Sequence, residues 1–206
     1  MPRTPANPAA GALGFRVHSG WASAVAVGGD ARSPVALDRR RIELADRSVA
    51  GSVQPFHAAQ RLDLKKAERL IERCRESTDI LAENGLRAMI TDLGKKGVQV
   101  VGASIVLASG RTLGTLESTL ASHALIHTAE GEFFRDAVRR AAGKCSVSVT
   151  GIKEREILEH GSGALGLAAS EIQEHTVEMG RALGPPWRQD EKLAALAAWL
   201  VLASSR

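Results

Sequence analysis

Residues 98–107, with the sequence VQVVGASIVL, constrain the fold more than any other part of the chain. The segment is almost wholly apolar and rich in β-branched side chains, which is typical of a strand buried on both faces. Such a strand belongs in the interior of a parallel sheet, and helices must cover both faces of that sheet. The segment therefore predicts an α/β protein in which residues 98–107 form a central parallel strand.

Three shorter segments of apolar or alternating character precede this strand. They are Leu13–Val17, Ala22–Val27 and Pro34–Leu44. Ser-Gly at residues 19–20 and Gly-Gly-Asp at residues 28–30 are turn signals between them. Together they predict an antiparallel meander of three strands.

Helical spacing of apolar residues marks much of the remaining chain. It extends from Lys65 to Leu93, where Asn84 and Gly85 predict a break into two helices. The other predicted elements are helices over Leu113–Ala142, Leu165–Leu183 and Trp187–Ala203, and a fifth strand over Ser146–Ile152. The order is therefore βββαβαβα. Right-handed crossovers in this order place the fourth and fifth strands parallel to the first.

Composition narrows the class of protein. Residues 1–12 hold three of the seven prolines, so we expect a disordered tail there and a single domain over residues 13–206. Two cysteines cannot form a disulfide framework, and the longest apolar run, Leu193–Ala203, is too short to span a bilayer. The N-terminus lacks the apolar core of a signal peptide. We therefore expect a cytoplasmic protein that does not enter a membrane.

Two segments and the element order resemble one known superfamily. The segment GFRVHSGWASAVAV is similar to the opening strand-turn-strand of resolvases, and DEKLAALAAWLVLA is similar to their last helix, where a carboxylate precedes alanines and leucines. The chain thus resembles the ribonuclease H-like superfamily, which includes resolvase and transposase nucleases. The resemblance implies a mixed five-stranded sheet with flanking helices. A doubly wound fold with an antiparallel extension is the alternative.

The resemblance also implies a nuclease site, from which this sequence departs. Active members hold divalent metal ions between carboxylates on the first strand, the fourth strand or a nearby helix, and the last helix. Here His18 stands where the first strand should supply an Asp, and residues 98–107 contain no acid. Only Asp190 and Glu191 match the pattern, and acids there also stabilise the first turn of a helix. Because one or two carboxylates make a poor magnesium site, we expect no nuclease activity.

A stripe of polar residues is the most unusual feature of the chain. His123, His127 and Glu130 share one face of a predicted helix that is otherwise apolar. Three interpretations are open. The histidines are core or subunit-contact residues, with Glu130 paired to His127, or the stripe and His18 line a pocket that binds a small molecule or phosphate ester. In the third interpretation they form a transition-metal site, with Glu130 or His18 as a further ligand. A helix that restarts with Ser122 as its cap would bring both histidines into its first turns and would favour a site.

Two further motifs concern phosphate binding. Gly161, Gly163 and Gly166 match GxGxxG at the start of a predicted helix, but a charged segment precedes them, and a flexible helix entry is the simpler explanation. The cluster Arg39–Arg41, in a chain with a net charge of +4, permits nucleic-acid binding. A solvated strand end explains this cluster more simply.

Three classes of function follow. The leading interpretation is a non-nuclease protein that binds a ligand or a partner through the region of His18, His127 and Glu130. A structural homodimer joined through apolar helices, with Trp187 and Trp199, is another class. The enzymatic alternative is a divergent nuclease or phosphodiesterase that uses a divalent metal, with the catalytic residues His18, Glu130, Asp190 and Glu191.

Overall fold

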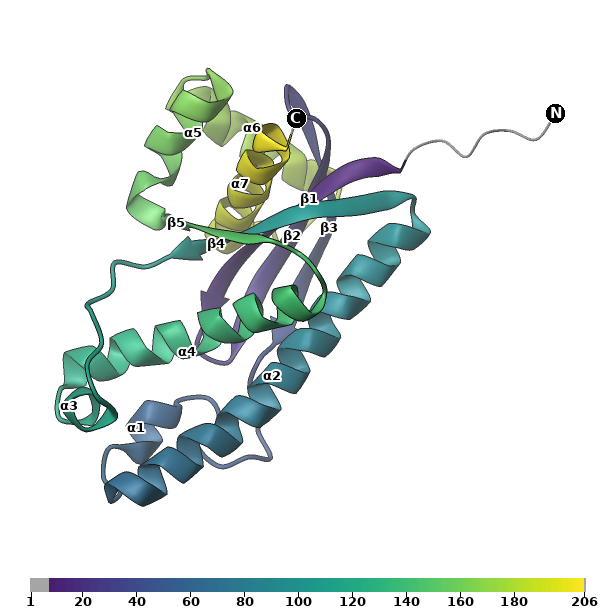
Figure 1. Cartoon of the computed structure of the whole chain (residues 1–206). Helices are drawn as coiled ribbons and strands as arrows, with labels where there is room; N and C mark the ends of the chain where they lie inside the picture. Colours follow the sequence, from purple (N-terminus) through teal and green to yellow (C-terminus); the bar gives the residue numbers. More distant parts are fainter. Residues whose placement is uncertain (1–7, 206) are drawn as a thin grey trace.

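The computed structural model describes residues 8–205, and its centre is a five-stranded sheet (Figure 1). The strands lie in the order β3-β2-β1-β4-β5. β1 pairs antiparallel with β2 and parallel with β4, β2 pairs antiparallel with β3, and β5 pairs parallel with β4. The predicted meander, central parallel strand and mixed sheet are confirmed. The strands are β1 (Ala9–His18), β2 (Trp21–Asp30), β3 (Ser33–Glu43), β4 (Val98–Leu107) and β5 (Val149–Lys153).

Helices cover both faces of the sheet (Figure 1). One layer comprises α1 (Pro55–Ala59), α2 (Leu64–Lys95), α3 (Leu116–Leu120) and α4 (His123–Lys144). The opposite layer comprises α5 (Ile157–Leu165), α6 (Ala169–Arg181) and α7 (Gln189–Ser204). A short 3-10 helix, η1 (Glu154–Glu156), joins β5 to α5.

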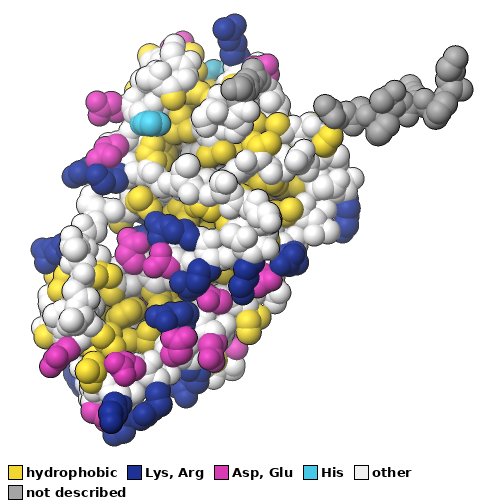
Figure 2. All heavy atoms as spheres, viewed as in Figure 1, with side chains coloured by type: hydrophobic (Ala, Val, Ile, Leu, Met, Phe, Trp, Pro, Cys, Tyr) yellow, Lys and Arg dark blue, Asp and Glu magenta, His cyan; other side chains and the backbone are white. Residues whose placement is uncertain are grey.

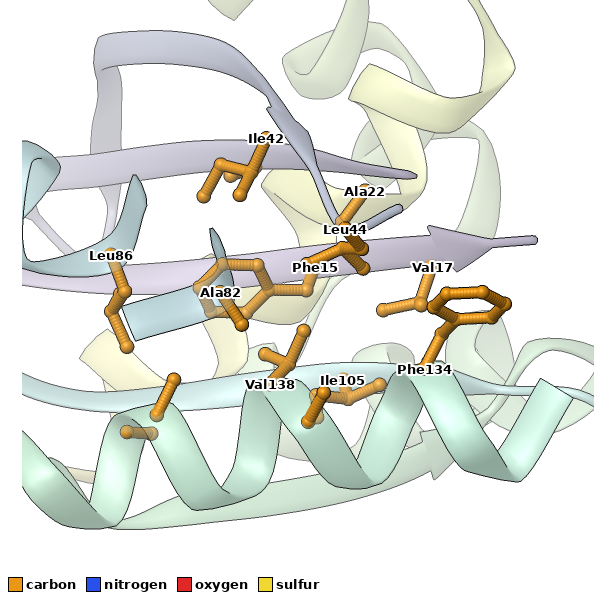
Figure 3. Packing of buried hydrophobic residues seen from close by; sticks show 14 of the residues in the cluster. Phe15, Val17, Ala22, Ile42, Leu44, Ala82, Leu86, Ile105, Phe134 and Val138 are labelled. Atoms are coloured by element: carbon orange, nitrogen blue, oxygen red, sulfur yellow. The ribbon is translucent and has the colours of Figure 1, made fainter. Parts of the chain in front are cut away.

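Side chains of β1 alternate between these two layers. Phe15 and Val17 are buried beneath the α2 and α4 layer, where Val17 lies near Phe134 of α4 and Phe15 near Ala82 of α2 (Figure 3). Gly14 faces the other way, and a Cβ on this residue would lie 1.8 Å from the carbonyl oxygen of Ala194 in α7. The backbone of α7 therefore packs directly on β1, which only a glycine at position 14 permits.

The structure corrects the predicted tail and the predicted break in the first long helix. β1 begins at Ala9, which pairs with Val98 of β4, so residues 9–12 lie in the sheet and not in a tail. Residues 1–7 of the predicted tail lie outside the described residues. α2 continues through Gly85, where a Cβ would lie 2.5 Å from Cγ2 of Ile42 in β3. This glycine serves close packing and does not end the helix.

The single helix predicted over Leu113–Ala142 is two helices, α3 and α4. Ser122 occupies the N-cap position of α4 in an extended conformation. His123 and His127 therefore lie in the first two turns of α4. The alternative in which the helix restarts at Ser122 is confirmed.

The GxGxxG motif ends a helix and does not open one. The chain enters α5 at Ile157, before the motif, so Gly161 and Gly163 lie inside this helix. Gly166 is the C-cap, in the left-handed conformation with a φ of 67°. The helix predicted over Leu165–Leu183 accordingly begins at Ala169. The motif presents no helix N-terminus to a phosphate group.

Acidic and basic side chains are interleaved over α2 and α4 (Figure 2). Arg140 of α4 makes a bidentate ion pair with Asp79 of α2. The arginines of the cluster Arg39–Arg41 also have partners within the protein. Arg39 donates to carbonyl groups near the start of α7, and Arg40 pairs with Asp38 and Asp92. Arg41 pairs with Glu43. Among residues 8–205, no helix combines the length and apolar character that crossing a bilayer requires.

Candidate metal centre

Three histidines converge where α1 meets the first turns of α4 (Figure 1). They are His57 of α1 and His123 and His127 of α4. One ring nitrogen from each lies within 4.8 Å of the other two, and Nε2 of His123 is 3.0 Å from Nε2 of His127. His123 and His127 are exposed, and His57 is partly buried. Imidazole nitrogens grouped in this way are the donor set that zinc-class ions prefer.

Glu130 fixes the backbone that carries His57. Its Oε1 accepts hydrogen bonds from the backbone N–H groups of Phe56 and His57, at 2.9 and 3.0 Å. Gln54, at the N-cap position of α1, makes no capping hydrogen bond through its side chain. A carboxylate from α4 therefore accepts hydrogen bonds from the free backbone N–H groups in the first turn of α1. The side chain of the N-cap residue ordinarily takes this role.

Aromatic packing holds the same two helices together. The rings of Phe56 and Phe133 meet edge to face, with 6.1 Å between centroids. Pro55 begins α1 at a position that suits proline, and it is buried. The ring of His57 consequently lies 4.9 Å from that of His127, measured between centroids. The histidine side chains are thus positioned by the packing of α1 on α4.

The contact with Glu130 engages one of the two ring nitrogens of His57. Nδ1 of His57 is 3.1 Å from Oε1 of Glu130. When Nδ1–H donates to this carboxylate, Nε2 is left with an unprotonated lone pair. A carboxylate behind an imidazole orients a metal-binding histidine and raises its basicity. Glu130 is therefore placed to support a ligand and not to be one.

Burial gives Glu130 an unusual electrostatic environment. Its side chain is 4% exposed, and Oε2 is buried without a hydrogen-bond partner among residues 8–205. Burial raises the pKa of Glu130, and the hydrogen bonds from His57 act in the opposite direction. The charged form of this carboxylate is therefore stabilised by positive charge nearby.

The structure changes the predicted pairing in this stripe. Glu130 is buried as expected, but its partner is His57, and the predicted pairing with His127 is wrong. His127 faces His123 because the two residues are one turn apart on the exposed side of α4. Sequence analysis misses His57 because α1 has five residues and no apolar periodicity. Its one local signal is a proline in the first turn of a helix.

A second polar cluster lies at the end of β1, on the α7 face of the sheet. Nε2 of His18 is 3.0 Å from Oδ1 of Asp190, and its ring stacks on Trp21 with 4.4 Å between centroids. Arg16 lies on the same strand, with Nη2 2.7 Å from Oε2 of Glu154 and Nε 4.0 Å from Oδ1 of Asp190. A guanidinium thus stands between the two carboxylates of this cluster.

Glu191 has a separate and local role. Its Oε2 accepts a hydrogen bond from the backbone N–H of Arg188, at 2.7 Å, and its Oε1 is 3.5 Å from Oγ of Ser23. This carboxylate therefore stabilises the first turn of α7. Of the two acids that match the superfamily pattern, only Asp190 contacts His18.

The two clusters belong to different faces of the sheet. His18 contacts Trp21 of β2 and Asp190 of α7, whereas α4 packs on the other face with Phe15 and Val17 of β1. Side chains of adjacent strand residues point to opposite faces, so His18 and Val17 diverge. The predicted pocket that joins His18 to His127 and Glu130 is therefore wrong. His18 is also not among the three histidines that converge.

Comparison with known proteins identifies the fold. No family model matches the chain, and no curated protein matches it. The solved structure of RuvC from Thermus thermophilus is similar, with a TM-score of 0.52, 10% sequence identity, and coverage of 92% of this chain and 91% of RuvC. T. thermophilus RuvC in complex with a Holliday junction substrate gives a TM-score of 0.50 at 11% identity, with the same coverage. The chain therefore has the ribonuclease H-like fold that is found in the RuvC resolvase.

Proposed function

We propose that this chain is a non-nuclease protein of the ribonuclease H-like fold that binds one transition-metal ion, of the zinc class, through His57, His123 and His127. The observation that carries the proposal is the convergence of three imidazoles within 4.8 Å, one of them hydrogen-bonded to a buried carboxylate. Two nitrogens on one tetrahedral zinc ion, each about 2.0–2.1 Å from it, lie about 3.3 Å apart. The separation of 3.0 Å between His123 and His127 is close to this value.

The chemistry of the donors selects the kind of metal. Imidazole nitrogen suits zinc, copper, nickel and cobalt, whereas magnesium and calcium take oxygen ligands. The three converging donors are all nitrogens. We therefore expect zinc or cobalt to bind and magnesium not to compete.

A titration of the full chain tests this proposal. Zinc is added to metal-free protein in competition with a chromophoric chelator, and cobalt is added in a parallel experiment. We expect one equivalent of each metal to bind, with the intense visible absorption of four-coordinate cobalt. His160→Ala, which removes an exposed histidine of α5, should leave binding unchanged. Absence of saturable binding of either metal would overturn the proposal.

Glu130→Gln is expected to weaken zinc binding by roughly 10- to 100-fold. The amide keeps an oxygen for the backbone N–H groups of Phe56 and His57, so α1 stays in place. It removes the negative charge behind His57, which makes the imidazole a poorer ligand. Competition with the same chelator measures the change. Equal affinity in the variant and the parent would show that Glu130 has no supporting role.

The cluster at the end of β1 supports the non-nuclease part of the proposal. A two-metal site needs several oxygen ligands with free lone pairs and a net negative charge. Here the guanidinium of Arg16 lies 2.7 Å from Glu154 and 4.0 Å from Asp190, so it offsets one of their two negative charges. Nε2 of His18 also lies 3.0 Å from Oδ1 of Asp190, although the geometry between them does not make a hydrogen bond.

With magnesium or manganese, we expect no cleavage of four-way DNA junctions, duplex DNA or RNA–DNA hybrid above the rate without protein. Electrophoresis of end-labelled substrates provides the measurement. Asp190→Asn serves as the matched variant. Metal-dependent cleavage that disappears in Asp190→Asn would establish the nuclease alternative in place of this proposal.

A further inference from the structure

The number of ligands at the histidine cluster distinguishes two kinds of zinc site. Structural zinc sites are closed by four protein ligands, whereas catalytic sites have three and keep one position for water. Among residues 8–205, no fourth His, Cys, Asp or Glu joins the three histidines. Glu130, the carboxylate that contacts His57, is directed at Nδ1 of that ring and at two backbone N–H groups. The donor set therefore leaves one coordination position open.

The charge of the ligands determines what an ion there would do to a bound water. Three neutral imidazoles leave the full double charge on a zinc ion. An ion in such a site lowers the pKa of its bound water to about 7. Two of the three histidines are exposed, so water and a substrate have access. The site thus has the composition of a hydrolytic centre.

A groove beside His57 indicates the class of substrate. It has a volume of about 610 Å³ and is lined by Arg47, Gln54, His57 and Ala58, among others. Arg47 is exposed, and its guanidinium has no ion-pair partner among the described residues 8–205. The groove contains one histidine of the cluster, His57, and a cation in it favours a molecule with a negative charge.

We propose that the zinc ion of this centre hydrolyses carboxylic esters that carry a negative charge, which Arg47 binds; this inference rests on the proposed metal site. The zinc-bound hydroxide forms a bond to the carbonyl carbon of the ester. The bond from that carbon to the alcohol oxygen breaks, and the leaving oxygen takes the proton of the former hydroxide. A new water displaces the carboxylate product from zinc and releases a proton to solvent.

Two matched probes test the reaction and the role of Arg47. They are 4-acetoxybenzoate, which is anionic, and its neutral methyl ester, and release of the phenol is followed by absorbance. We expect zinc-dependent hydrolysis of both probes, with the higher kcat/KM for the anionic one. Arg47→Gln should lower kcat/KM for 4-acetoxybenzoate about three- to five-fold and leave the value for the methyl ester unchanged.

Controls separate this inference from the proposed metal site. Free imidazole also hydrolyses activated esters, so only the part of the rate that a chelator removes and zinc restores is counted. His160→Ala should retain that part of the rate, and His57→Ala should lose it. Binding of one zinc ion without any zinc-dependent hydrolysis would overturn this inference and leave the metal site standing. Failure to bind zinc at all would overturn both. Zinc-dependent hydrolysis without preference for the anionic probe would overturn the assigned substrate class.

Discussion

His57→Ala is expected to weaken zinc binding by more than about 100-fold. Loss of a group that only hydrogen-bonds to a metal ligand costs roughly 10- to 100-fold in affinity, and in the proposed site His57 is itself a ligand. The two histidines of α4 remain, but a pair of ligands on one exposed helix face holds an ion less tightly than three. Competition with a chromophoric chelator gives the ratio of affinities.

The metal-free protein should be less stable in His57→Ala by about 1–3 kcal/mol, because the buried carboxylate of Glu130 loses its contact with Nδ1 of this ring. The loss is no larger because the carboxylate keeps its hydrogen bonds to the backbone N–H groups of residues 56 and 57, and the imidazole is 22% exposed. His18→Ala is the matched control for affinity, since His18 lies on the other face of the sheet with Asp190. An unchanged affinity in His57→Ala, or an equal loss in His18→Ala, would contradict the assignment of ligands.

Gly14→Ala is expected to destabilise the fold by about 3 kcal/mol or more, at the upper end of the range for overpacking of a core. The added Cβ would lie 1.8 Å from the carbonyl oxygen of Ala194 and 2.8 Å from the backbone nitrogen of Ala198. Backbone atoms cannot rotate away as the end of a side chain can. All of α7 would therefore have to move from the sheet, which would open the core that includes Trp199.

Gly163→Ala is the control for that experiment. Gly163 lies inside α5, and a Cβ there would meet nothing within 4 Å. Alanine is favoured over glycine in a helix by up to about 1 kcal/mol, so this variant should be as stable as the parent or slightly more so. Urea unfolding of both variants gives the two changes in free energy. Equal stability of Gly14→Ala and the parent would show that α7 does not pack on β1 as described.

The sequence predicts the fold through patterns that are local. The apolar run of β4 and the turn signals between β1, β2 and β3 need no distant contact to be recognised. The predicted break at Gly85 is wrong. This glycine leaves room for the side chain of Ile42 on β3, which is far away in the sequence. A glycine that ends a helix and one that serves close packing have the same letter, and only tertiary contacts separate them.

The candidate site could be predicted only in part for the same reason. His123 and His127 are four residues apart, so helical spacing alone places them together. His57 joins them through α1, a helix too short to show periodicity, and through a hydrogen bond to Glu130 across the chain. The sequence therefore offered two histidines and an acid but not the third histidine. Sequence analysis groups His18 with them because the sequence does not show which helix covers which face of the sheet.

The measurement that tests the metal site most directly is anomalous X-ray diffraction at the zinc absorption edge, from crystals grown with one equivalent of zinc. We predict one strong anomalous peak between the rings of His57, His123 and His127, about 2.0–2.1 Å from a nitrogen of each. Nδ1 of His57 should remain on Glu130, with Nε2 toward the metal. A peak beside Asp190 and Glu154, or no peak at the three histidines, would contradict the assignment.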